Sequence, residues 1–126
     1  MNGAKWLLDT NVVIGLLKKQ SAAVALAEAQ HLELSQAVVS QITRMELLGF
    51  SNLAKEEEAA ILEFLQNCRT LFVDEAVERQ AIQLRRTSQC KLPDAIIAAT
   101  AQVHQLTLLT LDQRLEKLAV QLKNTQ

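Results

Sequence analysis

Proline, glycine and cysteine are scarce in this chain, which has 126 residues but only one proline, three glycines and two cysteines. Such a composition excludes a collagen-like chain, a low-complexity disordered segment and a small disulfide scaffold. Cys68 and Cys90 lie far apart in the sequence and form no CxxC pair. We therefore expect two reduced, buried thiols, as is usual in a reducing cytoplasm.

An excess of charge of one sign and long apolar runs are also missing. The formal net charge is −1, so the chain lacks the overall basic field that many nucleic-acid-binding proteins carry. The apolar run from Trp6 is interrupted at Asp9, and the run from Val12 to Leu17 is far too short to span a bilayer. These absences favour a cytoplasmic protein without membrane contact, in which any nucleic-acid function depends on a local site.

Segments with strand character alternate along the chain with segments of helical period. We expect strands at 5–8, 33–39, 70–73 and 106–111, and a short edge strand at 120–122. We expect helices at 12–19, 21–30, 41–49, 55–67, 75–84, 94–105 and 113–118. This alternation predicts a parallel sheet with helices on both faces. The expected fold is therefore α/β: one domain, residues 1–126, built as a three-layer α/β/α sandwich around a mostly parallel central sheet.

Four acidic residues stand where one edge of this sheet would bring them together. Asp9 follows the first strand, Asp112 follows the fourth, and Glu46 lies in the helix after the second. Asp94 falls in the first turn of a helix that opens at Pro93, a position where proline is tolerated. In an open α/β sheet, sites form outside the carboxyl ends of the strands. We therefore expect the four carboxylates to share one pocket.

The surroundings of these acids indicate a metal ion. Asp9, Glu46 and Asp94 are embedded in apolar runs, and Arg44 is the only cation within two residues of any of them. Carboxylates converging at about 4 Å would repel one another by roughly 4 kcal/mol per pair at an effective dielectric near 20. A divalent cation removes this repulsion, and oxygen ligands favour Mg²⁺ or Mn²⁺ over zinc. Such a site would support metal-assisted hydrolysis of phosphodiesters, with absolute metal dependence.

Four segments resemble the motifs of the PIN-domain family, most closely those of VapC-type toxins from bacterial toxin–antitoxin pairs. They are LLDTNVVIGLL (7–17), SQITRMELLGF (40–50), KLPDAIIAATA (91–101) and LTLLTLDQRL (106–115). The resemblance covers nearly the whole chain. It implies a quartet of catalytic acids that also bind the metal: Asp9, Glu46, Asp94 and Asp112. It further implies three polar residues that steady the site and contact the substrate: Thr10, Asn11 and Thr110.

The same resemblance implies an endoribonuclease that cuts RNA by Mg²⁺- or Mn²⁺-dependent hydrolysis. Proteins of this kind are usually homodimers. A cognate antitoxin typically wraps the toxin and inserts a segment into the acidic pocket. We therefore expect RNA as substrate, products with 5′-phosphate and 3′-hydroxyl ends, and an antitoxin as protein partner.

Each candidate residue also has a simpler interpretation when taken alone. Aspartates that follow strands often cap helices, which is worth about 1 kcal/mol. Glu46 could pair with Arg44, and we favour a structural role for that arginine. The basic pairs at 18–19 and 85–86 are interpreted as solvated helix faces, and the two histidines as surface or helix-face residues. Capping does not explain, however, why the acids recur at the same end of the elements.

Three other classes of protein are compatible with parts of the pattern. A phosphotransfer receiver domain needs a lysine at a late strand end, and residues 106–111 contain none. A phosphatase of the haloacid dehalogenase type needs Asp-x-Asp where this chain has Asp9, Thr10 and Asn11. A PIN-like protein-binding module with an idle metal site stays open as the alternative.

Overall fold

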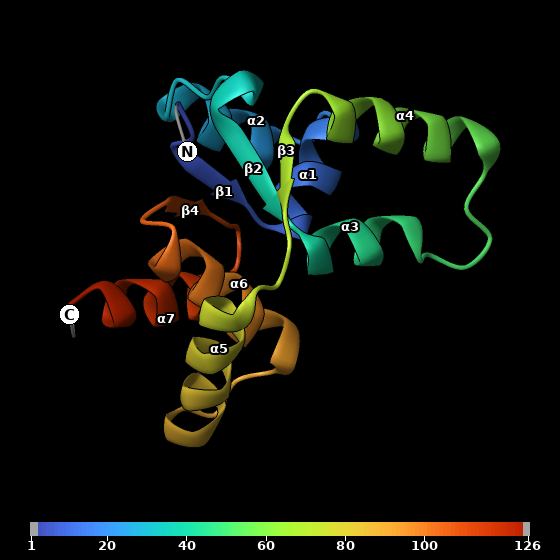
Figure 1. Cartoon of the computed structure of the whole chain (residues 1–126). Helices are drawn as coiled ribbons and strands as arrows, with labels where there is room; N and C mark the ends of the chain where they lie inside the picture. The colour runs from blue at the N-terminus through green and yellow to red at the C-terminus, as the bar shows by residue number, and fades with distance from the viewer. Residues whose placement is uncertain (1–2, 125–126) are drawn as a thin grey trace.

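The helices and strands form three layers in a computed structural model that describes residues 3–124 (Figure 1). In chain order the elements are β1 (Trp6–Leu8), α1 (Thr10–Leu17), α2 (Ser21–Ala29), the 3-10 helix η1 (Leu34–Gln36), β2 (Ala37–Ser40), α3 (Gln41–Leu48), α4 (Lys55–Gln66), β3 (Arg69–Leu71), α5 (Glu75–Thr87), α6 (Leu92–Val103), β4 (Thr107–Leu109) and α7 (Gln113–Asn124). None of the described helices is long and apolar enough to cross a membrane.

The strands lie in the order β3-β2-β1-β4, and every neighbouring pair is parallel. Trp6 is opposite Ala37 of β2 on one side of β1 and opposite Thr107 of β4 on the other. β1 and β2 are buried along their whole length, as expected for central strands of a parallel sheet covered on both faces. Because all strands point the same way, their carboxyl ends meet at one edge.

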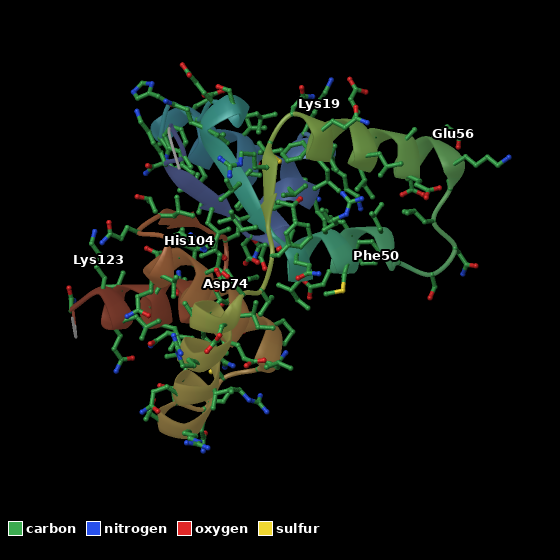
Figure 2. All side chains as sticks on the ribbon, viewed as in Figure 1. Lys19, Phe50, Glu56, Asp74, His104 and Lys123 are labelled. Carbon is green, nitrogen blue, oxygen red and sulfur yellow. The ribbon has the colours of Figure 1, made fainter. Side chains whose placement is uncertain are left out.

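Two hydrophobic cores lie on opposite faces of the sheet because side chains alternate along each strand. Leu7 and Val38 belong to the core shared with α5, α6 and α7. Leu8 and Val39 belong to the core shared with α1, α3 and α4. Figure 1 shows the same division, with α1 to α4 in the upper and right-hand part of the view and α5 to α7 in the lower part. Charged side chains such as Glu56 and Lys123 project outward (Figure 2). The predicted three-layer sandwich with a parallel sheet is confirmed.

Two of the predicted strands differ from the structure by more than the residues at which they begin and end. The predicted edge strand at 120–122 is wrong, because these residues continue α7. Leu115, Leu118 and Leu122 recur at helical spacing and bury one face of that helix, whereas Val120 is 51% exposed. The predicted strand at 33–39 is shorter than expected, because its first half forms η1 and only the last residues join β2.

Both cysteines are free thiols, as predicted, although they are half-buried and not fully buried. Burial raises the pKa of the Cys68 thiol to about 11. A thiol with such a pKa stays protonated at neutral pH and is a poor nucleophile. Cys68 is therefore a packing residue.

Gly15 allows α1 and α2 to approach each other closely. Its position is buried, and a Cβ atom placed on it would lie 2.5 Å from the Cβ atom of Ala23 on α2. Any larger residue must push the two helices apart. Gly15 thereby helps to fix α1, whose first turn lies at the carboxyl edge of the sheet.

Replacing Gly15 by alanine is expected to destabilise the protein by about 1 kcal/mol. Overpacking costs about 1–3 kcal/mol, which exceeds the roughly 1 kcal/mol that alanine gains over glycine in a helix. Urea denaturation measures the change. The double variant with Ala23→Gly removes the clash and should recover part of the loss. A Gly15→Ala protein as stable as the wild type would contradict the close approach.

Candidate metal centre

Asp9 lies at the carboxyl end of β1 and caps α1. Its Oδ1 atom accepts a hydrogen bond from the backbone N–H of Thr10 (2.8 Å), and its Oδ2 atom accepts one from the hydroxyl of Thr110 (2.7 Å). Asp9 is only 7% exposed. Because Thr110 follows β4, the second bond joins the carboxyl ends of two adjacent strands.

Glu46 reaches the same edge from α3. This helix begins directly after β2, where the Ser40 hydroxyl oxygen accepts a hydrogen bond from the N–H of Ile42 (3.2 Å). The Thr10 hydroxyl donates to Oε1 of Glu46 (2.6 Å) and lies 3.1 Å from the hydroxyl of the buried Thr43. Thr43 and Glu46 share one helix face because they are three residues apart. The first turn of α1 therefore holds the Glu46 carboxylate at the site.

Asp94 enters the site from the first turn of α6, just after Pro93. Its side chain is half-buried, and it accepts no hydrogen bond from the part of the chain that the structure describes. The N-terminal end of a helix favours negative charge. Both oxygens of Asp94 are thus free to bind a cation from solution.

Asp112 follows β4 and caps α7. Its Oδ1 atom accepts hydrogen bonds from the N–H groups of Arg114 (2.9 Å) and Leu115 (3.4 Å). Asp112 is therefore the residue that caps α7, in line with the capping role that an aspartate after a strand often has. One carboxylate oxygen is therefore occupied by the helix, and Oδ2 remains for a ligand.

Asn11 and Thr110 hold the connection between β4 and α7 against the first turn of α1. Oδ1 of Asn11 accepts a hydrogen bond from the N–H of Leu111 (3.1 Å). The Thr110 hydroxyl accepts from the N–H of Asp112 (3.0 Å) while it donates to Asp9. These bonds position the acids. Contact of Thr10, Asn11 and Thr110 with a substrate stays a prediction.

The pKa of the Asp9 carboxyl lies above its ordinary value of 3.8, and burial is the main cause of the rise. The hydrogen bonds from Thr110 and Thr10 lower this pKa, but only in part. The charges of Asp94 and Glu46 raise it further.

Asp94 is affected in a similar way. Burial raises the pKa of its carboxyl above 3.8, and the negative charges of Asp112 and Glu46 add to the rise. Lys91 opposes the rise with its positive charge. All four predicted acids therefore lie within electrostatic reach of at least one other member.

This set of donors fits a hard divalent cation in an open site. Within residues 3–124, no three acidic, histidine or cysteine side chains converge into a ready-made metal cage, so the expected tight spacing of the four acids is not found. Mg²⁺ does not require such a cage, because it is usually bound through one or two carboxylates together with water and substrate phosphate. A cation would also relieve the repulsion that helps to raise the pKa values of Asp9 and Asp94.

Arg44 does not have the structural role that we expected for it. In the described part of the chain, ion pairs join only Arg79 to Glu75 and His104 to Asp74. Thr10 holds Glu46 instead. This partner of Glu46 could not be predicted from local sequence, because Thr10 precedes Glu46 by 36 residues.

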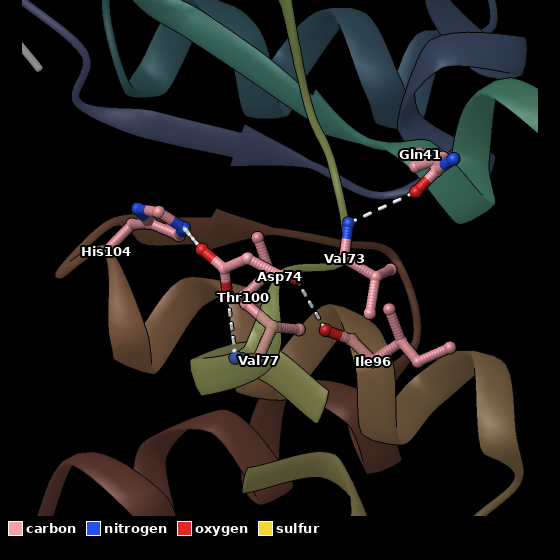
Figure 3. A network of polar contacts seen from close by, with 7 residues as sticks. All are labelled: Gln41, Val73, Asp74, Val77, Ile96, Thr100 and His104. Atoms are coloured by element: carbon pink, nitrogen blue, oxygen red, sulfur yellow. Dashed lines mark hydrogen bonds and ion pairs between the residues drawn. The ribbon is translucent and has the colours of Figure 1, made fainter. Parts of the chain in front are cut away.

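A polar network beside the site was not predicted from the sequence (Figure 3). Oε1 of Gln41 accepts a hydrogen bond from the N–H of Val73 (3.1 Å), which fixes the end of β3 to the start of α3. Asp74 caps α5 by accepting from the N–H of Val77 (2.9 Å), and its other oxygen lies 4.0 Å from Nε2 of His104. His104 is the half-buried C-cap residue that follows α6, so it does not lie on a helix face.

Asp94→Asn is expected to stabilise the metal-free protein at neutral pH by about 0.5 kcal/mol, with allowance for screening by water. A carboxyl whose pKa is raised in the folded state contributes stability below its unfolded pKa and loses it as the pH rises through the folded pKa. The melting temperatures of the variant and the wild type should therefore agree below pH 3.8 and diverge above the raised pKa. Thermal melts in EDTA measure this difference. A variant that is less stable at pH 7 would contradict it.

A parallel α/β sandwich that gathers carboxylates at the carboxyl edge of its sheet has the arrangement of an enzyme that uses a metal ion for hydrolysis. Residues 6–121 match the PIN domain family. The chain therefore belongs to the PIN-domain family.

Solved structures of related chains show the same fold over nearly the whole sequence. A chain of a toxin–antitoxin complex from Klebsiella pneumoniae is 30% identical, with a TM-score of 0.74 over 87% of this chain and 88% of that one. A chain of FitAcB from Neisseria gonorrhoeae is 31% identical, with a TM-score of 0.73 over 91% and 93%. A chain of DNA-bound VapBC from Salmonella typhimurium is 24% identical and shows the fold, with a TM-score of 0.77 over 90% and 91%. No curated protein matches the sequence.

Proposed function

We propose that this chain is the ribonuclease toxin of a toxin–antitoxin pair and hydrolyses RNA phosphodiester bonds with Mg²⁺ or Mn²⁺. The observation that carries the proposal is the gathering of four carboxylates at the carboxyl edge of the sheet: Asp9, Glu46, Asp94 and Asp112. Hydrogen bonds through Thr10, Asn11 and Thr110 hold three of them there, and the charge of Asp94 acts on Asp9. Membership of the PIN-domain family and 30% identity to a chain of a toxin–antitoxin complex support it.

The hydrogen bonds of the four acids indicate which of their oxygens are available to bind a metal ion. Asp94 has both oxygens free, and Asp9 accepts one hydrogen bond on each oxygen, which leaves lone pairs on both. These two residues would be the main ligands. Asp112 would add its Oδ2 atom. Glu46, held by Thr10, would bind a second cation or orient the attacking water.

When bound, the cation would lower the pKa of water, orient the phosphate and neutralise charge on the leaving oxygen. The carboxylates of Asp9 and Asp94 keep it at the sheet edge. The hydroxyl of Thr110 keeps Asp9 in place. Because the nucleophile is water and not the 2′-hydroxyl of RNA, the products should carry 5′-phosphate and 3′-hydroxyl ends.

The proposal includes a cognate antitoxin, a homodimer and a cytoplasmic location. Three large apolar side chains on the surface would be available for contact with such partners. Met45 is 54% exposed, Phe50 49% and Phe72 67%. Sedimentation should show a dimer at micromolar concentration, and a monomer there would contradict that part of the proposal.

The test of function is cleavage of single-stranded RNA by the purified protein with Mg²⁺ or Mn²⁺, with and without EDTA. A DNA strand of the same sequence serves as the matched control. We expect cleavage of RNA only, only with metal, and with 3′-hydroxyl ends. Activity that survives EDTA, or products with 2′,3′-cyclic phosphate, would contradict the mechanism.

Mn²⁺ is also expected to stabilise the folded protein. A ligand at 100 times its Kd that binds only the folded state adds about 2.7 kcal/mol. Thermal melts with and without millimolar Mn²⁺ measure this gain. No shift in the melting temperature would count against a metal site, and a shift without cleavage of RNA would favour the protein-binding module with an idle site.

A further inference from the structure

The loop that leads from α5 into α6 is tied to α5 at two points. Nη1 of Arg85 donates a hydrogen bond to the carbonyl of Cys90 (2.9 Å), and the Cys90 thiol lies 4.0 Å from the carbonyl of Leu84. Lys91 follows directly and is the N-cap residue of α6, where its carbonyl accepts from the N–H of Ala95 (2.9 Å). The backbone of Lys91 is therefore fixed from both sides.

The side chain of Lys91 lies close to the Asp94 carboxylate without pairing with it. Lys91 is exposed, and it precedes Asp94 by three residues, which places both on one face of the helix start. Lys91 forms no ion pair within residues 3–124. No other described lysine or arginine affects the pKa of Asp9 or Asp94. An unpaired ammonium group offers three donors and a full positive charge to an anion.

A nucleic-acid strand that crosses the site needs such a cation. The cation held by the carboxylates would screen the phosphate that is cut. With one divalent cation bound, the four carboxylates would still leave a net charge of −2 at the site (four negative charges against two positive), which would repel the next phosphate along the strand. Lys91 is the described cation that stands close enough to the acids to offset this repulsion.

We propose that Lys91 binds the backbone phosphate adjacent to the scissile phosphate of a single-stranded RNA. This inference rests on the proposed function for the position of the scissile bond. Arg85 is a positioning residue in it, because it fixes the loop that carries Lys91. A contact on the neighbouring phosphate also means that the enzyme favours bonds inside a strand over bonds at its end.

The variant Lys91→Gln tests the contact. Because the contact forms equally in the ground state and the transition state, KM should rise about three- to tenfold while kcat changes little. The affinity of the variant for RNA should also depend less on salt. Each phosphate contact with a single strand contributes about 0.7 to the magnitude of the slope of log K against the logarithm of the salt concentration. Binding is measured by fluorescence anisotropy with a labelled RNA in an Asp9→Asn background, which prevents cleavage.

Two variants complete the design. Lys123→Gln removes the same charge from the far end of α7, which lies roughly 16 Å along the helix from Asp112 at 1.5 Å per residue. Figure 2 shows Lys123 at the outer end of this helix. It should bind and cleave RNA like the wild type. Lys91→Arg keeps the charge and should restore most of the affinity and the salt slope.

These experiments distinguish a failure of the Lys91 inference from a failure of the proposed function. If wild-type protein cleaves RNA but Lys91→Gln matches it in KM and in salt slope, the inference is overturned. A lower melting temperature with unchanged affinity and slope also overturns it, because Lys91 would then only offset repulsion among the acids. If the wild type cleaves no RNA, the proposed function fails. The anisotropy series then decides alone whether Lys91 contacts a phosphate.

Discussion

Asp9→Asn is expected to lower the rate of RNA cleavage by about 100- to 1,000-fold. The substitution removes the most buried negative charge of the site, and transition-state stabilisation by a bound metal is worth several kcal/mol, at 1.36 kcal/mol per factor of ten. Asparagine keeps an oxygen that can accept from the Thr10 N–H. Its amide NH₂ group, however, cannot accept the hydrogen bond from Thr110.

The matched control for this variant is Asp74→Asn. Asp74 also follows a strand and also caps a helix, but its carboxylate lies against His104. Asparagine is an equally good N-cap, so this change should leave both folding and cleavage nearly unaffected. Single-turnover cleavage and thermal melts on both variants provide the comparison. An Asp9→Asn protein that cleaves RNA within threefold of the wild type would refute the assignment.

Thr110→Val is expected to weaken the response to metal by about 10- to 100-fold, the usual effect of losing a partner that orients a ligand. The Thr110 hydroxyl connects the Asp112 N–H with Oδ2 of Asp9, and valine has the same shape without the hydroxyl. The Mn²⁺ concentration for half-maximal cleavage should rise accordingly. Titration of cleavage rate against Mn²⁺ measures the effect.

Two further variants separate the role of the hydroxyl from its burial. Thr110→Ser keeps the hydroxyl and should respond to Mn²⁺ almost as the wild type does. Thr100→Val removes another buried hydroxyl, one that donates to the Ile96 carbonyl within α6 (2.7 Å), and should leave the metal response unchanged. Equal losses in Thr110→Val and Thr100→Val would show that the effect comes from packing and not from Asp9.

Local patterns in the sequence were sufficient for most of the fold. Alternation of apolar strands with helical segments predicts the layers, and strand ends predict which acids share an edge. The pattern failed at 120–122, where a short apolar run suits a strand or a helix equally well. The outcome depends on Leu115, Leu118 and Leu122, which pack against the core of α5 and α6. This is a tertiary contact, and it cannot be predicted from a short stretch of sequence.

The hydrogen bonds that hold the acids of the site could not be predicted from the sequence, for a similar reason. Asp9 contacts Thr110 because β1 and β4 are neighbours in the sheet. The residues of a single strand do not determine which strand lies next to it. Thr43 could not be recognised from the sequence either, since a threonine inside a helix is usually a packing or surface residue. Only the meeting of α1 and α3 shows that it lies beside Thr10 and Glu46.

The bond between Asp9 and Thr110 has a consequence for the timing of synthesis, because 101 positions separate the two residues. At about 5–20 residues per second, a ribosome adds Thr110 roughly 5–20 seconds after Asp9. During that interval the nascent chain carries Asp9 without the residues after β4 that complete the acidic edge. The four acids proposed to bind the metal therefore cannot act together until Thr110 and Asp112 have both been synthesised and β4 has joined the sheet.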